Sequence, residues 1–285
     1  GFTIGSTAST NIISAGTSNS YVAWCWDAGS GSPVSNTDGS ITSTVKANPD
    51  YGFSVVSYTG ADAVHTVGHG LTQAPEMVIV KNRTDATPWR VYHLYSNAST
   101  PEDYYLDLDS NGAASNATAF WNGTKPSTTV VSLSANNSVM NAKDYIMYCF
   151  HSVSGYSDFG SYIGNGSTSG PTVTTGFAPA LVIIKHAGTG DWLTVDNTRF
   201  PANPKNGSLA ANLANQESYF SGNTIQFNSD GFTIQTTNSV YNQNSGTYIY
   251  MAFADTRDAA FWLDESGNDN DWTVNNLEHS DVVPD

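Results

Sequence analysis

Aromatic residues with short polar neighbours are the part of this sequence best suited to binding chemistry. Proteins hold sugars with flat rings against the C–H faces and short polar groups against the hydroxyls. Trp89 and Trp192 recur at equivalent places of a sequence repeat, which favours a core role for both, whereas Trp121 has no repeat partner. The candidates for ligand contact are Trp89, Tyr92, His93, Trp121, Trp192, Asp196 and Arg199.

One motif could bind calcium. Asp107, Asp109, Asn111 and Gly112 reproduce the opening Asp-x-Asp-x-Asn-Gly of a calcium loop, in which alternate oxygen ligands converge on one ion. The closing Glu is missing, because Thr118 stands in its place. The incomplete match favours an ordinary hairpin turn, so we expect no cofactor, and calcium is the alternative.

Two further segments could hold an ion. His65 and His69 have a spacing found among zinc ligands, but Gly68 and Gly70 flank the second histidine and predict a turn. A local binding role for His69 stays open beside a structural one. The acidic run 264–271 is the other segment, with a solvated linker as its alternative.

The sequence lacks the arrangements typical of enzymes. A glycosidase needs two carboxylates that face each other across a cleft, and the five glutamates share neither a repeat partner nor a strand context. No serine or cysteine lies in a nucleophile motif, and there is no glycine-rich phosphate loop. We expect a protein without catalytic residues.

Charge and composition narrow the class of partners. Ten Lys and Arg stand against 25 Asp and Glu, a formal net charge of −15, which disfavours nucleic acid and anionic membranes. No apolar run is long enough to cross a bilayer, so we expect no membrane insertion. Charged residues make up only 12% of the chain, and Gly, Ser, Thr and Asn dominate the rest, as in turn-rich β proteins.

An internal repeat organises the chain. Segments recur 103 to 104 residues later in one register: 57–60 at 161–164, 74–81 at 178–185, and 145–150 at 248–253. These runs are four to eight residues long, rich in β-branched and aromatic side chains, and predict strands. Because several matching segments keep the same offset, the sequence indicates two copies of one fold.

The predicted fold class is all-β: tandem antiparallel β-sandwich repeats of a jelly-roll or lectin-like kind. The strands at 145–150 and 248–253 are apolar on both faces, so each needs cover on both sides, from the facing sheet and from a neighbouring unit or chain. We also predict one short helix within 208–217, where Leu209 and Leu213 are four residues apart.

The repeat sets the expected domain limits. Residues 1–4 recur at 231–234 and residues 21–26 resemble the closing strands, so 1–26 is expected to be the closing hairpin of a preceding unit or of the first one. Residues 27–51 are expected to form an inserted loop with a short strand at 39–45. The repeats follow at 52–155 and 156–256, and 257–285 is a linker toward a following domain of a longer protein.

The two cysteines occupy equivalent places of the repeat. Cys25 and Cys149 stand where the last copy has Ala252, which indicates a small buried position. Equivalent strands do not bring the two thiols together. We expect both cysteines to be free.

The motifs NTDGSI at 36–41, NPDYGFSVVSYTG at 48–60, VGHGL at 67–71 and VKNR at 80–83 together resemble a repeat domain of uncharacterised function that occurs in large virion proteins of marine tailed bacteriophages. The resemblance implies a tail-fibre-like or decorating component at the virion surface, outside the cell, and brings no site residues with it. It spans nearly the whole chain. The run SGNDNDWTVNN at 266–276 is similar to the connector that leads into another surface domain in such proteins.

The expected function is accordingly a structural module of a phage virion appendage that also contacts host-surface glycans. A dedicated carbohydrate-binding module is the alternative, with a polysaccharide depolymerase behind it. Expected partners are other virion proteins and copies of the chain itself, because strands with two apolar faces need extra cover. A trimer is favoured by the resemblance, because phage appendages of this kind commonly have threefold symmetry.

Overall fold

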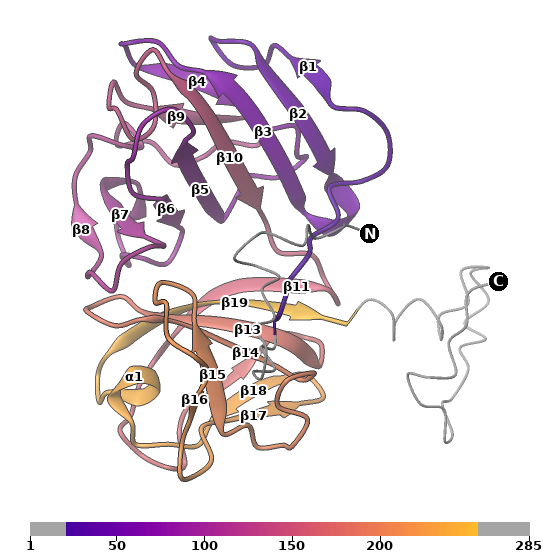
Figure 1. Ribbon diagram of the computed structural model, residues 1–285, viewed down its shortest axis with the longest axis vertical. Helices are drawn as coiled ribbons and strands as arrows, with labels where there is room; N and C mark the ends of the chain where they lie inside the picture. The colour runs from indigo at the N-terminus through magenta and orange to yellow at the C-terminus, as the bar shows by residue number, and fades with distance from the viewer. Residues whose placement is uncertain (1–20, 256–285) are drawn as a thin grey trace, which may run out of the picture.

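The β-branched and aromatic runs form antiparallel strands throughout the part of the chain that the structure, a computed structural model, describes, residues 21–255. The strands belong to two β-sandwiches, called unit 1 (residues 34–150) and unit 2 (residues 157–254), which are stacked one above the other in Figure 1. The predicted all-β class of tandem sandwich repeats is confirmed.

Unit 1 pairs a large sheet with a small one. The large sheet has the strand order β1-β2-β3-β10-β5-β6-β7-β8, and the small one pairs β4 with β9. The strands are β1 (Val34–Asn36), β2 (Ser43–Asn48), β3 (Phe53–Thr59), β4 (His65–Gly68), β5 (Met77–Asn82), β6 (Arg90–His93), β7 (Tyr104–Asp107), β8 (Ser115–Asn116), β9 (Val130–Leu133) and β10 (Asp144–Phe150). Single 3-10 turns lie at η2 (Pro49–Tyr51) and η3 (Pro101–Asp103).

Unit 2 repeats this plan. Its large sheet has the order β11-β19-β13-β14-β15-β16, which matches β3-β10-β5-β6-β7-β8 strand for strand. A small sheet, β12-β18-β17, covers it. The elements are β11 (Ser157–Ile163), β12 (Thr172–Thr174), β13 (Pro179–His186), β14 (Trp192–Asp196), β15 (Gly207–Ala210), β16 (Ser218–Tyr219), β17 (Ile225–Asn228), β18 (Gly231–Ile234), α1 (Ser239–Asn242) and β19 (Thr247–Ala254).

Equivalent tyrosines have equivalent roles in the two units. Tyr58 stacks on Tyr145 at 5.2 Å between ring centroids and donates its hydroxyl to a backbone carbonyl 2.6 Å away. In unit 2, Tyr162 stacks on Tyr248 at 4.9 Å and donates to a backbone carbonyl at 2.8 Å. The repeat therefore encodes buried polar contacts as well as strands.

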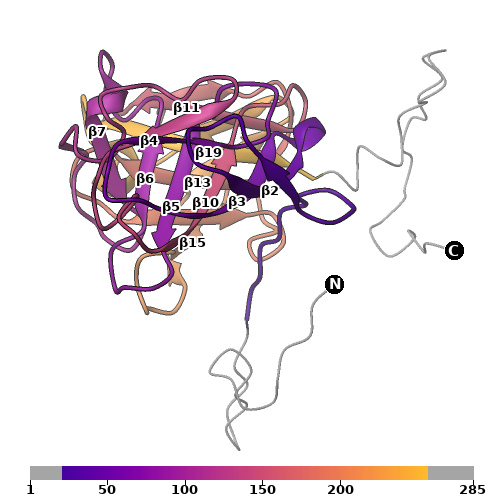
Figure 2. The ribbon, with the colours of Figure 1, turned by 90° about the horizontal axis from the view of Figure 1, so that it is seen from above.

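A third core lies between the two large sheets. Alternate residues of β19 point to opposite sides: Tyr248 and Tyr250 pack into the core of unit 2, whereas Ile249, Met251 and Phe253 pack against unit 1. Figure 2 looks through the stack, with β5, β10 and β3 over β11, β13 and β19. The second apolar face of the central strands is thus covered by the other repeat of the same chain.

Backbone hydrogen bonds also join the units. The Ala114 amide donates to the Ala187 carbonyl at 2.7 Å, and the Gly190 amide donates to the Asn111 carbonyl at 2.9 Å. These contacts close one end of the interface between the loops after β7 and β13.

Three local predictions are wrong. Segment 27–51 is not a loop with a strand at 39–45, because β1 and β2 extend the large sheet there and Val45 enters the core of unit 1. Segment 208–217 is not a helix: Leu209 pairs with Thr194 in the sheet, so tertiary pairing overrides the spacing of Leu209 and Leu213. Residues 21–26 do not form a strand, while the rest of the predicted hairpin, 1–20, lies outside the described residues.

The described part of the chain contains no helix long and apolar enough to cross a membrane. The predicted linker, 257–285, and the acidic run 264–271 within it lie outside the described residues.

Candidate functional site

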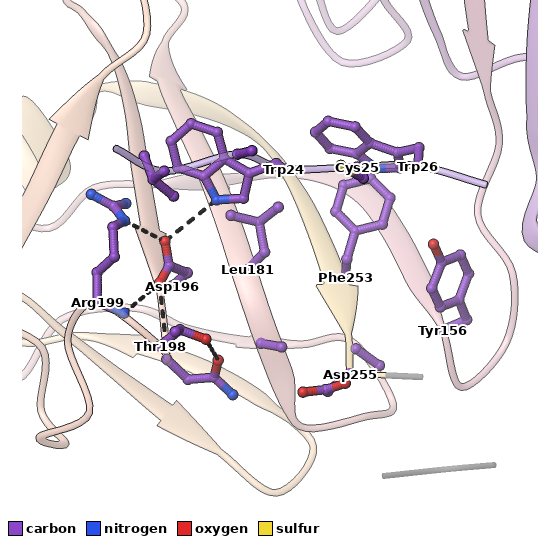
Figure 3. A pocket seen from close by; sticks show the side chains of 15 residues that line it. Trp24, Cys25, Trp26, Tyr156, Leu181, Asp196, Thr198, Arg199, Phe253 and Asp255 are labelled. Atoms are coloured by element: carbon purple, nitrogen blue, oxygen red, sulfur yellow. Dashed lines mark hydrogen bonds and ion pairs between the residues drawn. The ribbon is translucent and has the colours of Figure 1, made fainter. Parts of the chain in front are cut away.

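A pocket of about 450 Å³ opens where residues 21–28, called the crossing segment, run over the end of the large sheet of unit 2. The crossing segment forms one wall and the strands β13, β14 and β19 form the floor. Figure 3 shows Trp24 and Trp26 on the same side of the pocket, above Leu181 and Phe253. Asp196 and Arg199 lie at the Trp24 end, and Tyr156 at the Trp26 end.

Trp26 fixes one end of the crossing segment. Its ring lies edge-on to Phe253 at 5.6 Å and to Phe150 at 6.2 Å, both measured between centroids. Phe150 ends β10 of unit 1, and Phe253 lies near the end of β19 of unit 2. One indole therefore bridges the two units.

Trp24 is held at the other end by a charged network. The Arg199 guanidinium lies between two rings, 5.1 Å from the Trp24 centroid and 5.0 Å from that of Phe200, a cation–π arrangement. Arg199 Nε donates to Asp196 Oδ2 at 2.6 Å, and Trp24 Nε1 donates to the same oxygen at 3.4 Å. Arg199 also pairs with Glu217 at 2.5 Å.

Asp196 also shapes the loop that borders the pocket. It is the last residue of β14, and its Oδ1 accepts hydrogen bonds from the amides of Thr198 at 3.1 Å and Arg199 at 2.7 Å. This is an Asx turn, in which a short carboxylate replaces a backbone acceptor. The turn leaves Asn197 half-buried and Thr198 exposed at the rim.

The charged side chains at the Trp24 end of the pocket pair with one another. Two carboxylates, Asp196 and Glu217, surround the single guanidinium of Arg199, and Asp255 also borders the pocket. Burial, with smaller contributions from Tyr51 and Asp27, raises the pKa of Tyr156 to about 12. Its phenol is therefore neutral at physiological pH and able to donate a hydrogen bond.

Of the residues that the sequence singled out for binding, the pocket brings together Asp196 and Arg199. Trp121 and Tyr92 instead fill the core of unit 1, where their rings meet edge-on at 5.8 Å. The Trp121 indole donates to the Tyr104 carbonyl at 2.9 Å. Both residues are 1% exposed, so their expected ligand contact is wrong and the alternative core role holds.

Trp192 and His93 lie between the units. Trp192 Nε1 donates to the Asp107 carbonyl at 2.9 Å, and His93 Nε2 contacts the Tyr250 carbonyl at 3.2 Å. Burial lowers the His93 pKa to about 4, partly opposed by that carbonyl. Both side chains are buried, which makes them interface residues.

Trp89 is half-buried and packs on the same shared core. Its ring stacks with Tyr148 at 6.5 Å, with the Lys81 ammonium 5.9 Å from its centroid. The recurrence of Trp89 and Trp192 in the repeat therefore reflects packing between the units.

His69 is also structural. It is fully buried, its Nε2 contacts the Ser127 carbonyl at 3.1 Å, and its Nδ1 accepts from the Leu71 amide at 3.2 Å. Burial lowers its pKa, although the hydrogen bond to Ser127 opposes the shift. Both ring nitrogens are thus used within the fold, and His65 contacts Ser40 instead of His69.

The predicted calcium ligands do not converge. Asp107 pairs with Arg90 at 2.6 Å, and its pKa is raised because burial outweighs that ion pair. Asp109 accepts the Trp89 amide at 3.1 Å, and the Asn111 carbonyl accepts from Gly190. Within residues 21–255, no group of three His, Cys, Asp or Glu side chains is placed to hold a metal ion.

Sequence reasoning missed the aromatic wall of the pocket, Trp24 and Trp26. The sequence pattern at these residues is a match between 21–26 and the closing strands 145–150 and 248–253, in which Trp26 aligns with Phe150 and Phe253. That match indicated burial in a sheet. The same error affects Cys25, which is exposed, whereas Cys149 is buried; both are free, as predicted.

The model of one protein family, described as a domain of unknown function (DUF7483), matches residues 1–257. This range contains both units and the crossing segment. Comparison with curated proteins and with solved structures finds no match.

Proposed function

The chain belongs to the DUF7483 family, and from that premise we propose that it is a structural module of a phage virion appendage, either a tail fibre or a surface decoration. The virion context comes from the sequence resemblance. The structural role is supported by one observation above all, the apolar core that joins the two units.

That core makes two domains into one building block. Interfaces between domains of a chain are usually polar enough to permit relative motion. Here Phe159, Met251 and Phe253 of unit 2 pack against Phe53, Met77 and other residues of unit 1 in one buried cluster. A pair of sandwiches locked in this way suits a spacer that must keep its shape under load.

Location and partners follow from the same proposal. The module lies at the virion surface, outside the cell, and its partners are other virion proteins, host-surface glycans and copies of itself. Mass spectrometry of purified particles of the encoding phage tests the location. We expect the chain at several copies per particle, with antibodies against it labelling the tail or the capsid surface; its absence from intact particles would overturn the proposal.

A homo-oligomer, with a trimer favoured, remains part of the proposal, and it now rests on the resemblance to phage appendages alone. The apolar second faces of β10 and β19 are covered within the chain, so they no longer call for another copy. Light scattering measures the molar mass in solution, which is 30.3 kDa for a single chain and three times that value for a trimer. A monomer at micromolar concentration removes self-association from the proposal.

The pocket geometry favours the carbohydrate-binding alternative over the depolymerase. A glycosidase keeps one carboxyl group free as an acid and another as a base or nucleophile. Asp196 accepts from two backbone amides, Arg199 and Trp24, which are contacts that orient a loop and a wall.

A further inference from the structure

We infer that the pocket beneath Trp24 and Trp26 binds a neutral saccharide, an inference that rests on the glycan contact of the proposed function and assigns it a site and a ligand class. Its volume of about 450 Å³ lies within the range of small-molecule sites, about 300–1,000 Å³. The pocket also joins an aromatic wall to a polar rim, the combination that a pyranose ring with apolar and hydroxylated surfaces requires.

The aromatic wall is held in place before any ligand arrives. Trp26 packs on Phe150 and Phe253, and Trp24 is positioned by the Arg199 guanidinium and by the Asp196 carboxylate. A ring that is already ordered loses little side-chain entropy on binding. Leu181 extends the apolar surface from the floor, as Figure 3 shows.

The polar rim offers groups that can reach hydroxyls. The Asn197 side-chain oxygen accepts a long, weak hydrogen bond from the Thr198 hydroxyl, at 3.5 Å. Both residues border the pocket, and Thr198 is exposed. The Asn197 amide can donate and accept, and so can the Thr198 hydroxyl, which matches the dual hydrogen-bonding character of a sugar hydroxyl.

Charge selects neutral saccharides over acidic ones. Arg199 would be the natural partner of a sugar carboxylate, but it is already paired with Asp196 and Glu217. An acidic sugar at Arg199 would also approach the carboxylates of Asp196 and Glu217, within a chain of net charge −15. Like-charge contact of this kind disfavours uronate and sialate residues.

The test uses the whole 285-residue chain. A glycan array is followed by isothermal titration calorimetry with four neutral trisaccharides, maltotriose, cellotriose, mannotriose and N-acetylchitotriose, and with trigalacturonate as the acidic probe. We expect at least one neutral probe to bind with a millimolar or tighter Kd and the acidic probe to bind at least about tenfold more weakly. Absence of binding by all neutral glycans on the array and in solution overturns the inference, as does a preference for the acidic probe.

Two variants locate the binding. Trp24→Ala removes the aromatic surface and Asn197→Ala removes the amide, and each should weaken the Kd at least about tenfold. Tyr95→Ala is the matched control, an aromatic deletion at an exposed residue that follows β6 and does not line the pocket. Because Trp24→Ala also loosens the crossing segment, the milder Asn197→Ala variant, checked by circular dichroism, decides the matter. An unchanged Kd in Asn197→Ala and Trp24→Ala, with both folded, places the sugar elsewhere and overturns the inference.

A failure here is distinguishable from a failure of the structural proposal. Particle composition is measured without any sugar, so a virion module that binds no saccharide is a separate and recognisable outcome.

Discussion

Phe150 and Phe253 are equivalent residues of the two repeats, and their rings meet each other edge-on at 6.5 Å between centroids. The repeat thus provides both halves of its own interface. Trp26, the residue that aligns with both, completes the group by packing on each of them. Three copies of one sequence position converge at the edge of the pocket.

Truncating this group should destabilise both units together. Phe253→Ala removes a buried ring from the shared core and is expected to lower the free energy of unfolding by about 3–5 kcal/mol. Urea unfolding measures the loss of free energy, and hydrogen exchange with mass spectrometry should show reduced protection in β10 as well as in β19. Ile163→Ala, at a 56% exposed position of β11, should change stability by no more than about 0.5 kcal/mol. Loss of protection in unit 2 alone would contradict a shared core.

Gly52 should not tolerate a side chain. Its φ of +61° is left-handed, and a Cβ would lie 2.4 Å from the His151 carbonyl oxygen. We expect Gly52→Ala to cost at least about 2 kcal/mol. Gly31→Ala is the matched control, because Gly31 has a φ of +89° with nothing within 4 Å of a Cβ. Equal thermal shifts for the two variants would mean that the close approach at Gly52 contributes nothing.

His93 should make the interface sensitive to acid. Its pKa falls from 6.5 to about 4 in the folded chain because burial disfavours the imidazolium. The unfolded chain therefore binds the proton first, and stability is kept above pH 6.5 and lost as the pH falls toward 4. Between pH 6.5 and 5 this amounts to about 2 kcal/mol.

His93→Gln is the variant that isolates this effect. Glutamine retains a donor for the Tyr250 carbonyl but does not titrate. The neighbouring Glu76, Asp158 and Tyr95 are common to both proteins, so urea unfolding at pH 7.5 and pH 5 should show a smaller acid loss in the variant. A parallel loss in both proteins assigns the acid sensitivity to other groups.

The two thiols should react very differently in the folded chain. Cys25 is exposed on the crossing segment, whereas Cys149 is buried and burial raises its pKa. Iodoacetamide without reductant should add one group to the native chain, at Cys25, and two groups after denaturation. Peptide mapping of the alkylated chain gives the positions. Native labelling of Cys149 would show that the core of unit 1 opens readily.

The repeat made much of the fold predictable. A constant offset of 103 to 104 residues identified equivalent strands of the two units, such as β5 and β13, and the run of apolar residues in β10 and β19 indicated cover on both faces. Local pattern was less informative at 208–217, where two leucines at helical spacing lie in and after a strand. Pairing with β14 decides that segment, and a short window does not contain its partner.

The candidate site was only half predictable. Asp196 and Arg199 could be chosen by residue type, since they are polar neighbours of Trp192 of the kind that can bind sugar hydroxyls. Trp24 and Trp26 could not, because their segment carries the pattern of a closing strand. That pattern forms a strand only where a neighbouring strand provides backbone hydrogen bonds, and residues 21–26 do not form a strand.

By itself, then, the sequence determined the strand type, the repeat and the need to cover two apolar faces, because these depend on side-chain periodicity along the chain. The tertiary structure decided what covers those faces and which aromatic rings remain at the surface. Trp121 and Trp24 are the same residue type, yet the first is 1% exposed and the second lines a pocket. The difference comes from contacts with residues distant in sequence, Tyr92 and Tyr104 for Trp121 and Arg199 for Trp24, which no local pattern specifies.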